Sequence, residues 1–575
     1  MKLFAKIFAL AIGMFLLTSF GDQPPTGNPR LGLPAELRQI MDENREITFP
    51  PPHPDLEDTV NSFIKLNLDR DEHIRIFEAL RQVRTQQDHY TLRRVFGRPN
   101  FGAFLTHEQL GEEIRFLFDL LRHGYDGYLY FGGDEVFLPI RDAMLESLAG
   151  MPDPLRATSY LDDLLLPAFQ GVVADNHFQI QHVRFGPPAH VPYMNEGYVL
   201  RRGGSGFVVE IDGATHGLVE VKGLPLPSAS GILPTLTPDG ELAWAFGFVK
   251  VESQQGAMEI TVLLEDTVTG ENRSRPVTLR RVDSPRFPTH PVIVKHEVEG
   301  ITVLENRSLR NLSNEENAAF LQSGYGLRDR PILVMDLRGH TGGGTGLPSM
   351  WIANYTGQTM GLGQNSLFAA SILMRSRVKL ELIHFFTPLY RSILMDRYSN
   401  WNFDVGICPR FAAPEHLPLL APTPGSFERD SALRFETIAR VNAGKDLRDP
   451  MLGYLSLSTS VRTIRPHVPI PNRNLVIVLT DKNIASTGDL FVGHLRQLEN
   501  VLVVGTNTSG TFFTGAVGST MLPHSGFAVR VGTRLNLRHD LSQFEGVGFM
   551  PDLWVPPGES LERVLRFIER YGLAR

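Results

Sequence analysis

Three short apolar runs in the C-terminal half of the chain have the length and composition of buried strands. They cover residues 332–335, 475–479 and 501–504, and Asp336 directly follows the first of them. Between the second and the third run, apolar residues recur at the spacing of one helical face: Phe491, Val492, Leu495 and Leu498. A strand, a helix and a strand in this order predict a βαβ unit with parallel strands.

Helical patterns are also clear nearer the two ends. Thr106 begins a capping box, and the apolar residues that follow lie on one helical face: Leu110, Ile114, Leu117, Leu120 and Leu121. Near the C-terminus, a last helix with Gly572 as its C-cap is predicted by Leu561, Val564, Leu565 and Ile568. We therefore expect a helical N-terminal domain over residues 55–185 and a helix that closes the chain.

The middle of the chain has a different pattern. Short β-rich runs separated by Gly, Pro, Asn and Asp predict a small β-rich domain over residues 186–290. Residues 291–575 have the mixed pattern of an α/β domain, interrupted by a long insertion at residues 345–470. Part of that insertion, residues 365–398, has a helical pattern, and part is rich in proline.

The N-terminus has the features of an export signal. Lys2 and Lys6 precede an apolar run at residues 7–20, which is short for a membrane span and is followed by Gly21. We predict a signal peptide over residues 1–21 and a Pro-rich arm over residues 22–54, which places the protein outside the cell or in the cell envelope or periplasm. The alternative is an uncleaved segment that anchors the chain in a membrane.

Composition limits the class of protein. The 575 residues suggest two to four domains, and 42% hydrophobic with 21% charged residues is typical of a soluble globular chain. The net charge of −7 gives no basic footprint for nucleic acid. The single cysteine, Cys408, rules out an intrachain disulfide framework and a multi-cysteine zinc site. Neither a metal-ligand spacing nor a cofactor fingerprint is found, so we expect no metal and no cofactor, and the oligomeric state stays open.

A glycine-rich turn follows the first apolar run. Its sequence is DLRGHTGGG, from Asp336 to Gly344. Consecutive glycines let backbone N–H groups converge on one point, which suits an anion or an oxyanion. The turn lacks the Lys-Ser/Thr ending of a phosphate-binding loop.

Ser486 stands where the second apolar run gives way to the predicted helix, in the string ASTGDLF. At such a junction a hydroxyl is exposed beside the free N–H groups of the helix terminus. These residues alone favour the simpler interpretation that Ser486 is an N-cap. A third turn, GTNTSGT at residues 505–511, either borders a pocket or only reverses the chain.

Taken together, the strings DLRGHTGGG, ASTGDLF, VGTNTSG and EGVGFMPD resemble the tail-specific, or C-terminal processing, serine peptidases. This family also includes the core of tricorn protease and the retinoid-binding repeats of the photoreceptor matrix. Upstream, Ala174-Asp-Asn-His-Phe resembles the D-G-H-T/F string of the family. The resemblance covers residues 290–560 well and residues 60–180 loosely. It implies a ClpP/crotonase-like α/β catalytic domain, with residues 190–285 at the position where many members carry a PDZ domain.

The resemblance also implies roles for single residues. Ser486 stands at the position of the nucleophile. The N–H groups of Gly342 or Gly343 and of Thr487 would hold the oxyanion. Asp336 and Arg338 would fix the glycine-rich turn by ion pairing.

The general base is the point at which this chain departs from the family. The lysine of the Ser-Lys members is replaced by Thr511, whose hydroxyl cannot serve as a base. The nearest lysine, Lys482, has the pattern of a surface residue. Tricorn-like members use a histidine supported by a glutamate. Glu545 matches that glutamate, but the position of the histidine is occupied by Glu305.

Two other histidines are candidates for the base. His340 lies within the glycine-rich turn and should be near Ser486, although it could simply orient the turn through a backbone hydrogen bond. His177, in the Asp-Asn-His-Phe string, is the second candidate, and a structural role is the more common one for such a residue.

Two functions follow from these residues. The first is a secreted serine peptidase that hydrolyses peptide bonds in extended peptides through an acyl-enzyme on Ser486. The second is an inactive family member that binds a peptide or a hydrophobic ligand. Ser486, the glycines and Glu545 favour the peptidase, whereas Thr511 favours the binding module.

Overall fold

The computed structural model describes most of the chain outside its first residues and the long insertion. It covers residues 32–56, 101–204, 206–222, 224–225, 231–252, 256–288, 290–310, 312–344, 346–357, 370–373 and 468–574, with scattered residues between 58 and 80. The predicted signal peptide, Cys408 and most of the insertion lie outside the described residues.

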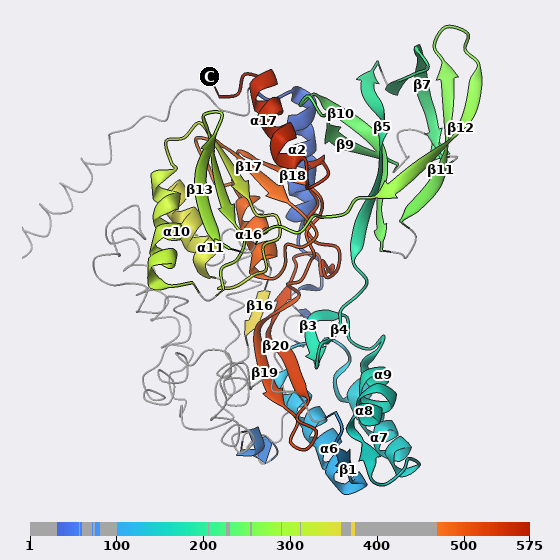
Figure 1. Cartoon of the computed structure of the whole chain (residues 1–575), viewed down its shortest axis with the longest axis vertical. Helices are drawn as coiled ribbons and strands as arrows, with labels where there is room; N and C mark the ends of the chain where they lie inside the picture. The colour runs from blue at the N-terminus through green and yellow to red at the C-terminus, as the bar shows by residue number, and fades with distance from the viewer. Residues whose placement is uncertain are drawn as a thin grey trace, which may run out of the picture.

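A six-stranded sheet forms the centre of the C-terminal part (Figure 1). Its order is β13-β14-β15-β17-β18-β21, in which β13 and β14 form an antiparallel hairpin and the other neighbours are parallel. The strands are β13 (Ile293–Val298), β14 (Ile301–Asn306), β15 (Ile332–Asp336), β17 (Leu475–Thr480), β18 (Val501–Gly505) and β21 (Leu553–Trp554). With α16 (Thr487–Leu495) between β17 and β18, the predicted parallel βαβ unit is confirmed.

Helices cover both faces of this sheet, which explains why its central strands are apolar throughout. One face packs against α10 (Asn314–Gly326), α11 (Gly346–Thr356) and α16 through a core that includes Phe320, Trp351 and Phe491. The other face packs against α2 (Ala35–Thr48) and the predicted last helix, α17 (Ser560–Arg570). Strands buried on two sides lose the alternation of polar and apolar residues.

The β-rich middle of the chain folds as an antiparallel sheet at one side of the molecule (Figure 1). Its main path is β12-β11-β7-β6-β5-β10-β9, and β8 pairs with β7. The strands are β5 (His190–Gly203), β6 (Gly206–Ile211), β7 (Ala214–Val221), β8 (Leu224–Pro225), β9 (Ile232–Leu236), β10 (Leu242–Val251), β11 (Ala257–Asp266) and β12 (Asn272–Arg281). This sheet shares a hydrophobic core with α2 and α17, so it is packed onto the six-stranded sheet.

The helical region lies at the opposite end of the molecule from α17 (Figure 1). It contains α6 (His107–Gly124), α7 (Gly133–Ala149), a short strand pair β1 (Phe104–Leu105) and β2 (Leu155–Arg156), and a last helical stretch. That stretch comprises α8 (Ala157–Ser159), a π-helical turn (Tyr160–Leu165) and α9 (Leu166–Phe169). Thr106 caps α6 in a full capping box with Gln109, as predicted.

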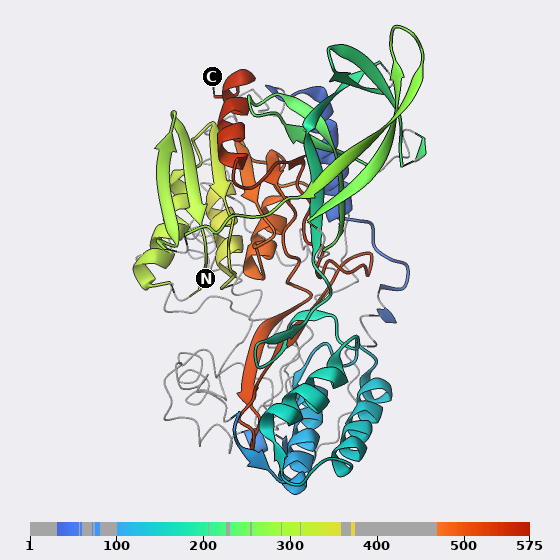
Figure 2. The ribbon, with the colours of Figure 1, turned by 45° about the vertical axis from the view of Figure 1, so that its right-hand side comes forward.

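A small antiparallel sheet joins this helical region to the C-terminal part. Its order is β16-β20-β3-β4, with β19 also paired to β20. The strands are β3 (Asp175–Ile180), β4 (Val183–Phe185), β16 (Ala370–Leu373), β19 (Thr514–Met521) and β20 (Ala528–Leu537). Both views show β3 and β4 beside the β19–β20 hairpin (Figures 1 and 2). The core of the helical region includes side chains of β3 and β20, so two distant parts of the sequence share one core.

One local expectation from the sequence differs from the structure. Residues 370–373 were expected in a helical stretch, but they form β16 because β20 offers an antiparallel partner from Arg534 to Leu537. The aromatic string at residues 123–137 is packed, with Tyr125 and Tyr128 buried. None of the helices in the described part of the chain is both long and apolar enough to cross a bilayer.

Candidate active site

Ser486 lies on a strained turn between β17 and α16. Its backbone angles are φ 59° and ψ −118°, in the region of positive φ that side chains other than glycine rarely adopt. Such a conformation costs about 1–3 kcal/mol and persists where the surrounding structure holds it, often at functional sites. The residue is at the N-cap position, but its hydroxyl makes no capping hydrogen bond. The simple N-cap interpretation therefore does not describe what this hydroxyl does.

The hydroxyl of Ser486 faces His177 instead. The Nε2 atom of His177 lies 3.3 Å from Ser486 Oγ, although the two residues are 309 positions apart in the sequence. His177 is in β3, and β3 reaches the site because it pairs with β20. Of the two candidate histidines, it is His177 that the fold brings to the predicted nucleophile.

The surroundings of His177 keep its imidazole neutral. Burial, together with the positive charges of nearby arginines, above all Arg530 and Arg310, lowers its pKa to about 3. A neutral imidazole has a free lone pair on one nitrogen and can accept a proton. The Nδ1 atom is buried and makes no hydrogen bond to any residue that the structure describes.

Two buried carboxyl groups fix the backbone around His177. Asp175 accepts hydrogen bonds from the His177 N–H at 2.8 Å and from the hydroxyls of Tyr125 and Thr514. Glu545 accepts from the Asn176 N–H at 2.8 Å. Burial raises the pKa of both carboxyl groups, and in Glu545 the nearby charge of Asp175 adds to the effect.

Glu545 also holds a second segment of the site. Its other oxygen accepts hydrogen bonds from the N–H groups of Phe512 and Phe513, at 3.1 and 2.9 Å. The carboxyl group therefore ties the start of β3 to the turn that precedes β19. Glu545, which the sequence matches to the glutamate of tricorn-like members, thus lies beside the segment that carries His177.

The glycine-rich turn packs directly against Ser486. Gly342 has φ 93°, and a Cβ atom there would lie 2.9 Å from the Cβ of Ser486. Gly343 has φ 143°, and a Cβ atom there would lie 2.1 Å from the carbonyl carbon of Leu309. Only glycine fits this backbone at both positions.

The donors predicted for the oxyanion differ in availability. The Gly342 N–H donates to Nδ1 of His340 at 3.0 Å and is therefore occupied. The N–H groups of Gly343 and Thr487 donate no hydrogen bond within the described ranges. The Thr487 hydroxyl donates to the Gly343 carbonyl at 2.7 Å, which holds these two residues together. Gly343 and Thr487 thus remain as the pair that could bind an oxyanion.

His340 holds the glycine-rich turn in place through hydrogen bonds. It is fully buried, its Nδ1 accepts the Gly342 N–H, and its carbonyl accepts the Ala485 N–H at 3.0 Å. Burial lowers its pKa to about 3, so the ring is neutral. The sequence ranked His340 first because it is close to the turn along the chain, and the structure uses it for the alternative role of orienting that turn.

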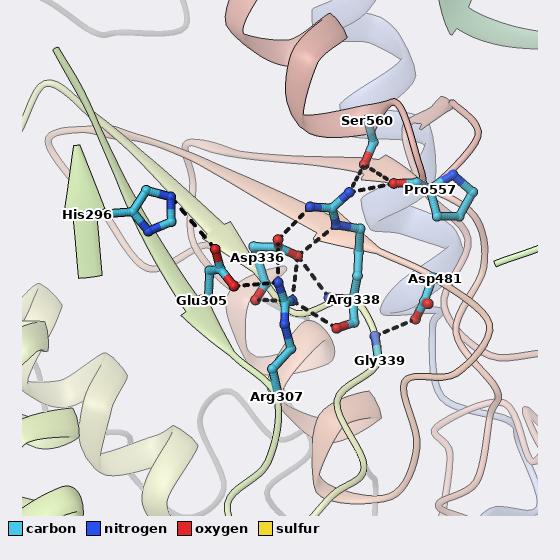
Figure 3. Close-up of polar contacts among 9 residues, drawn as sticks. All are labelled: His296, Glu305, Arg307, Asp336, Arg338, Gly339, Asp481, Pro557 and Ser560. Carbon is cyan, nitrogen blue, oxygen red and sulfur yellow. Dashed lines mark hydrogen bonds and ion pairs between the residues drawn. The ribbon is translucent and has the colours of Figure 1, made fainter. Parts of the chain in front are cut away.

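A buried ion-pair network anchors the start of the glycine-rich turn (Figure 3). Asp336 is 1% exposed and is bound by Arg307 at 2.8 Å and by Arg338 at 2.6 Å. Burial alone would raise the pKa of Asp336, but the two guanidinium groups lower it to about 2. The predicted ion pairing of Asp336 and Arg338 is therefore present. Glu305 accepts from Arg307 at 2.7 Å and belongs to this anchor.

Thr511 and Lys482, the two residues considered in connection with a lysine base, make other contacts. The Thr511 N–H donates to Asp489 at 3.1 Å, and its hydroxyl is 2.8 Å from the hydroxyl of Ser509. Lys482 points to the middle sheet, where its Nζ lies 3.8 Å from Glu252 and 3.7 Å from Asp283. His177 is thus the basic side chain at Ser486 in the described part of the chain. No cluster of metal-ligating residues is found within the described ranges.

Comparison with known proteins bears on this geometry. Residues 451–555, which include Ser486 and Glu545, match the model of peptidase family S41. The predicted resemblance to the tail-specific peptidases is confirmed. This S41 match supports a peptidase function and a peptidase-like fold of mixed helices and sheets. No curated protein matches the chain.

Several solved structures have low-scoring similarity to the whole chain. Mature CPAF matches with 15% identity and a TM-score of 0.36, over 81% of this chain and 96% of its own. The photosystem II D1 C-terminal processing protease matches with 13% identity and a TM-score of 0.30, over 79% and 96%. Tricorn protease matches with 13% identity and a TM-score of 0.27, over 80% of this chain and 37% of its own.

Proposed function

We propose that this protein is a serine-type peptidase that hydrolyses peptide bonds through an acyl-enzyme on Ser486. One observation carries the proposal: the Ser486 hydroxyl lies 3.3 Å from Nε2 of His177 on a strained strand-to-helix turn. A nucleophile within hydrogen-bond reach of a neutral base is the arrangement that acyl transfer requires. The S41 match over residues 451–555 supports the same class of reaction.

Acylation would involve Ser486, His177 and two backbone N–H groups. Ser486 Oγ attacks the scissile carbonyl carbon while His177 Nε2 takes the hydroxyl proton. The N–H groups of Gly343 and Thr487 stabilise the negative oxygen that forms on the substrate. The carbon–nitrogen bond then breaks, and the proton moves from His177 to the departing amine.

Deacylation would repeat the sequence with water. His177 takes a proton from a water molecule, whose oxygen attacks the ester carbonyl, and the same two N–H groups hold the oxyanion. The bond to Ser486 Oγ then breaks and the proton returns to that oxygen. Asp175 and Glu545 act as positioning residues, because they bind the backbone on either side of His177.

We propose in addition that the α/β part is a ClpP/crotonase-like catalytic domain and that the substrate is an extended segment of a peptide or protein. Such a segment could add as a strand beside the glycine-rich turn. The support for this is the turn itself, where Leu309 and Gly343 already form an isolated parallel bridge.

A fluorophosphonate probe tests the proposed reaction. The wild-type chain should be labelled at Ser486, and Ser486→Ala should remove all labelling. His177→Ala should lower the labelling rate by about 10²-fold or more, the usual share of a general base. Ser542→Ala, at an exposed serine, is the matched control and should label like the wild type.

The second candidate is a catalytically inactive module that binds a peptide or a hydrophobic ligand. Its support is that Nδ1 of His177 has no acceptor among the described residues, so no carboxylate bond fixes the ring as in a full triad. If neither labelling nor peptide cleavage occurs while a peptide still binds to wild type and Ser486→Ala alike, this second function holds.

We also propose that the chain is exported and that residues 1–21 are removed. The support is the charged start and apolar run at residues 2–20. N-terminal sequencing of the protein from the medium or envelope should begin at Asp22. A mature chain that begins at residue 1 and sediments with membranes would indicate the uncleaved anchor instead.

A further inference from the structure

Four arginines surround His177, and three of them lie on its own sheet. Gln179 in β3 is paired with Arg184 of β4 on one side and with Arg530 of β20 on the other. Residues directly opposite in a sheet share a face, and so do positions two apart along a strand. Arg184 and Arg530 therefore lie on the face of the sheet that presents His177.

The other two arginines extend this cluster toward the glycine-rich turn. Arg534 is four positions beyond Arg530 on β20 and thus on the same face. Arg310 directly follows Leu309, which bridges to Gly343 in the turn. All four arginines act on the pKa of His177 through their charges, so all four lie within electrostatic range of the proposed base.

Three of the four arginines, Arg184, Arg310 and Arg534, form no ion pair with a carboxylate in the parts of the chain that the structure describes. Arg530 donates to the neutral Gln179 amide at 3.3 Å. Burial and mutual repulsion act together, because the pKa of Arg310 is lowered first by burial and then by the charge of Arg184.

Elsewhere the same chain pairs its buried arginines. Arg307 and Arg338 bind Asp336, and Arg496 binds Asp552 at 2.9 Å, with side chains only 5%, 7% and 3% exposed. A guanidinium group without a partner is costly when it is removed from water. The cluster at His177 differs in its exposure, because Arg184 and Arg310 are exposed and Arg530 and Arg534 are half-buried, so these charges stay in contact with water and open to a bound ligand.

Arg534 has a hydrogen-bond donor that no described residue uses. Burial lowers its pKa to about 10, and its Nε is buried without a hydrogen-bond partner in the described ranges. Gly515 is opposite Arg534, and a Cβ atom there would lie 3.0 Å from Arg534 Nη2. The glycine therefore lets the guanidinium group lie directly against the neighbouring strand. The fork of donors of this group suits a carboxylate.

We propose that the substrate of this site carries an acidic side chain, Asp or Glu, close to the scissile bond, and that Arg184, Arg310, Arg530 and Arg534 bind its carboxylate. This inference rests on the proposed peptidase function and adds a substrate class to it.

The same carboxylate would also prepare the base. In the free protein, burial and then the arginine charges lower the pKa of His177. A bound carboxylate offsets those charges, so the imidazole becomes more basic when an acidic substrate occupies the cluster. Selection of the substrate and activation of His177 would then come from one interaction.

Binding to the Ser486→Ala variant tests the proposal without requiring catalysis. The probes are N-acetylated, C-terminally amidated fluorescent peptides that differ only in Glu or Gln at one central position. The Glu peptide should bind about tenfold more tightly than the Gln peptide, and the difference should shrink as salt increases.

Variants of the cluster then locate the effect. Adding Arg184→Gln and Arg310→Gln should remove the preference for Glu, whereas Arg280→Gln, on the exposed face of β12, should leave it unchanged. Arg184→Glu with Arg310→Glu should reverse the preference toward a Lys peptide. A misfolded protein could not produce such a reversal.

Two results would overturn the proposal. One is equal affinity for the Glu and Gln peptides in Ser486→Ala. The other is tight binding of a Gln peptide with a free C-terminal carboxylate, matched by weak binding of the amidated Glu peptide. That pattern would mean that the cluster binds a chain terminus. Failure of the peptidase function itself would be seen separately, as absent fluorophosphonate labelling of the wild-type chain.

Discussion

The Nε2 atom of His177 lies 3.3 Å from the Oγ atom of Ser486, and the two residues come from opposite parts of the chain. Ser486 is delivered by the parallel βαβ unit, whereas His177 is delivered by a strand that leaves the helical region and pairs with β20. These two elements are far apart in the sequence, so the site depends on the small sheet in which β3 pairs with β20.

The pH profile should reflect the lowered pKa of His177. Since the base acts only in its neutral form and its pKa is about 3, kcat/KM for a neutral peptide should stay level from pH 7 to about pH 4 and fall only below that. Burial of the imidazole is the largest cause of this lowered pKa, and the charges of the four arginines of the cluster add to it. Rates measured across pH, with circular dichroism at each pH, check it; a fall centred near the ordinary value of 6.5 would contradict it.

The acid limb of kcat should move with the substrate. This quantity reports the bound complex, and a carboxylate beside the arginines raises the pKa of His177. For a Glu peptide the limb of kcat should therefore lie at higher pH than for its Gln counterpart, while the limb of kcat/KM stays the same. If kcat falls at the same pH for the two peptides, the carboxylate of the Glu peptide does not change the pKa of His177.

Gly342→Ala should disable the site without unfolding the chain. The new Cβ atom would lie 2.9 Å from the Cβ of Ser486, on a backbone with φ 93°. Displacement of the nucleophile by even a fraction of an ångström should lower the labelling rate about 10²-fold. Gly344→Ala is a control in the same turn, because its nearest neighbour is the Leu347 side chain at an ordinary 3.6 Å. Similar losses in both variants would argue against a steric cause.

Glu545→Gln should impair the position of His177 more than the binding of substrate. An amide offers one acceptor oxygen, so it cannot serve Asn176 on one side and the Phe512 and Phe513 N–H groups on the other. One buried donor is then left unsatisfied, at a cost of about 1–3 kcal/mol in the free energy of unfolding. We expect kcat to fall about tenfold with little change in KM. Glu271→Gln, 64% exposed, serves as the control.

Arg338→Ala should loosen the glycine-rich turn from its anchor. The substitution leaves Asp336 buried with half of its positive partners, and breaking a buried pair in this way costs about 3–5 kcal/mol. Calorimetry should show a lowered Tm, and the remaining folded protein should label slowly. Arg273→Ala removes a pair that is 67% and 64% exposed, and it should change stability by less than about 1 kcal/mol.

The sequence predicted those parts of the fold that depend on local patterns. The apolar runs at β15, β17 and β18 indicate strands buried on both faces. The four-residue spacing of Phe491 and Leu495 indicates the helix between β17 and β18. The same strings placed Ser486 at a strand-to-helix junction. These features could be read because each follows from periodicity within a short segment.

The partner of Ser486 could not be read in this way. His340 was favoured because it is near the glycine-rich turn along the chain, but its Nδ1 is used by Gly342 within that turn. His177 becomes the neighbour of Ser486 only through the pairing of β3 with β20, a non-local contact that leaves no periodic signal. The signal that pointed to His177 was its place in the Asp-Asn-His-Phe string, read from resemblance alone.

The pairing of β3 with β20 also sets the moment at which the site can exist. Residues 175–180 leave the ribosome long before residues 528–537 that hold them, and Glu545 follows later still. Until β20 has been made, His177 has no strand to hold it beside Ser486. A chain that stops before β20 therefore lacks the proposed pairing of nucleophile and base.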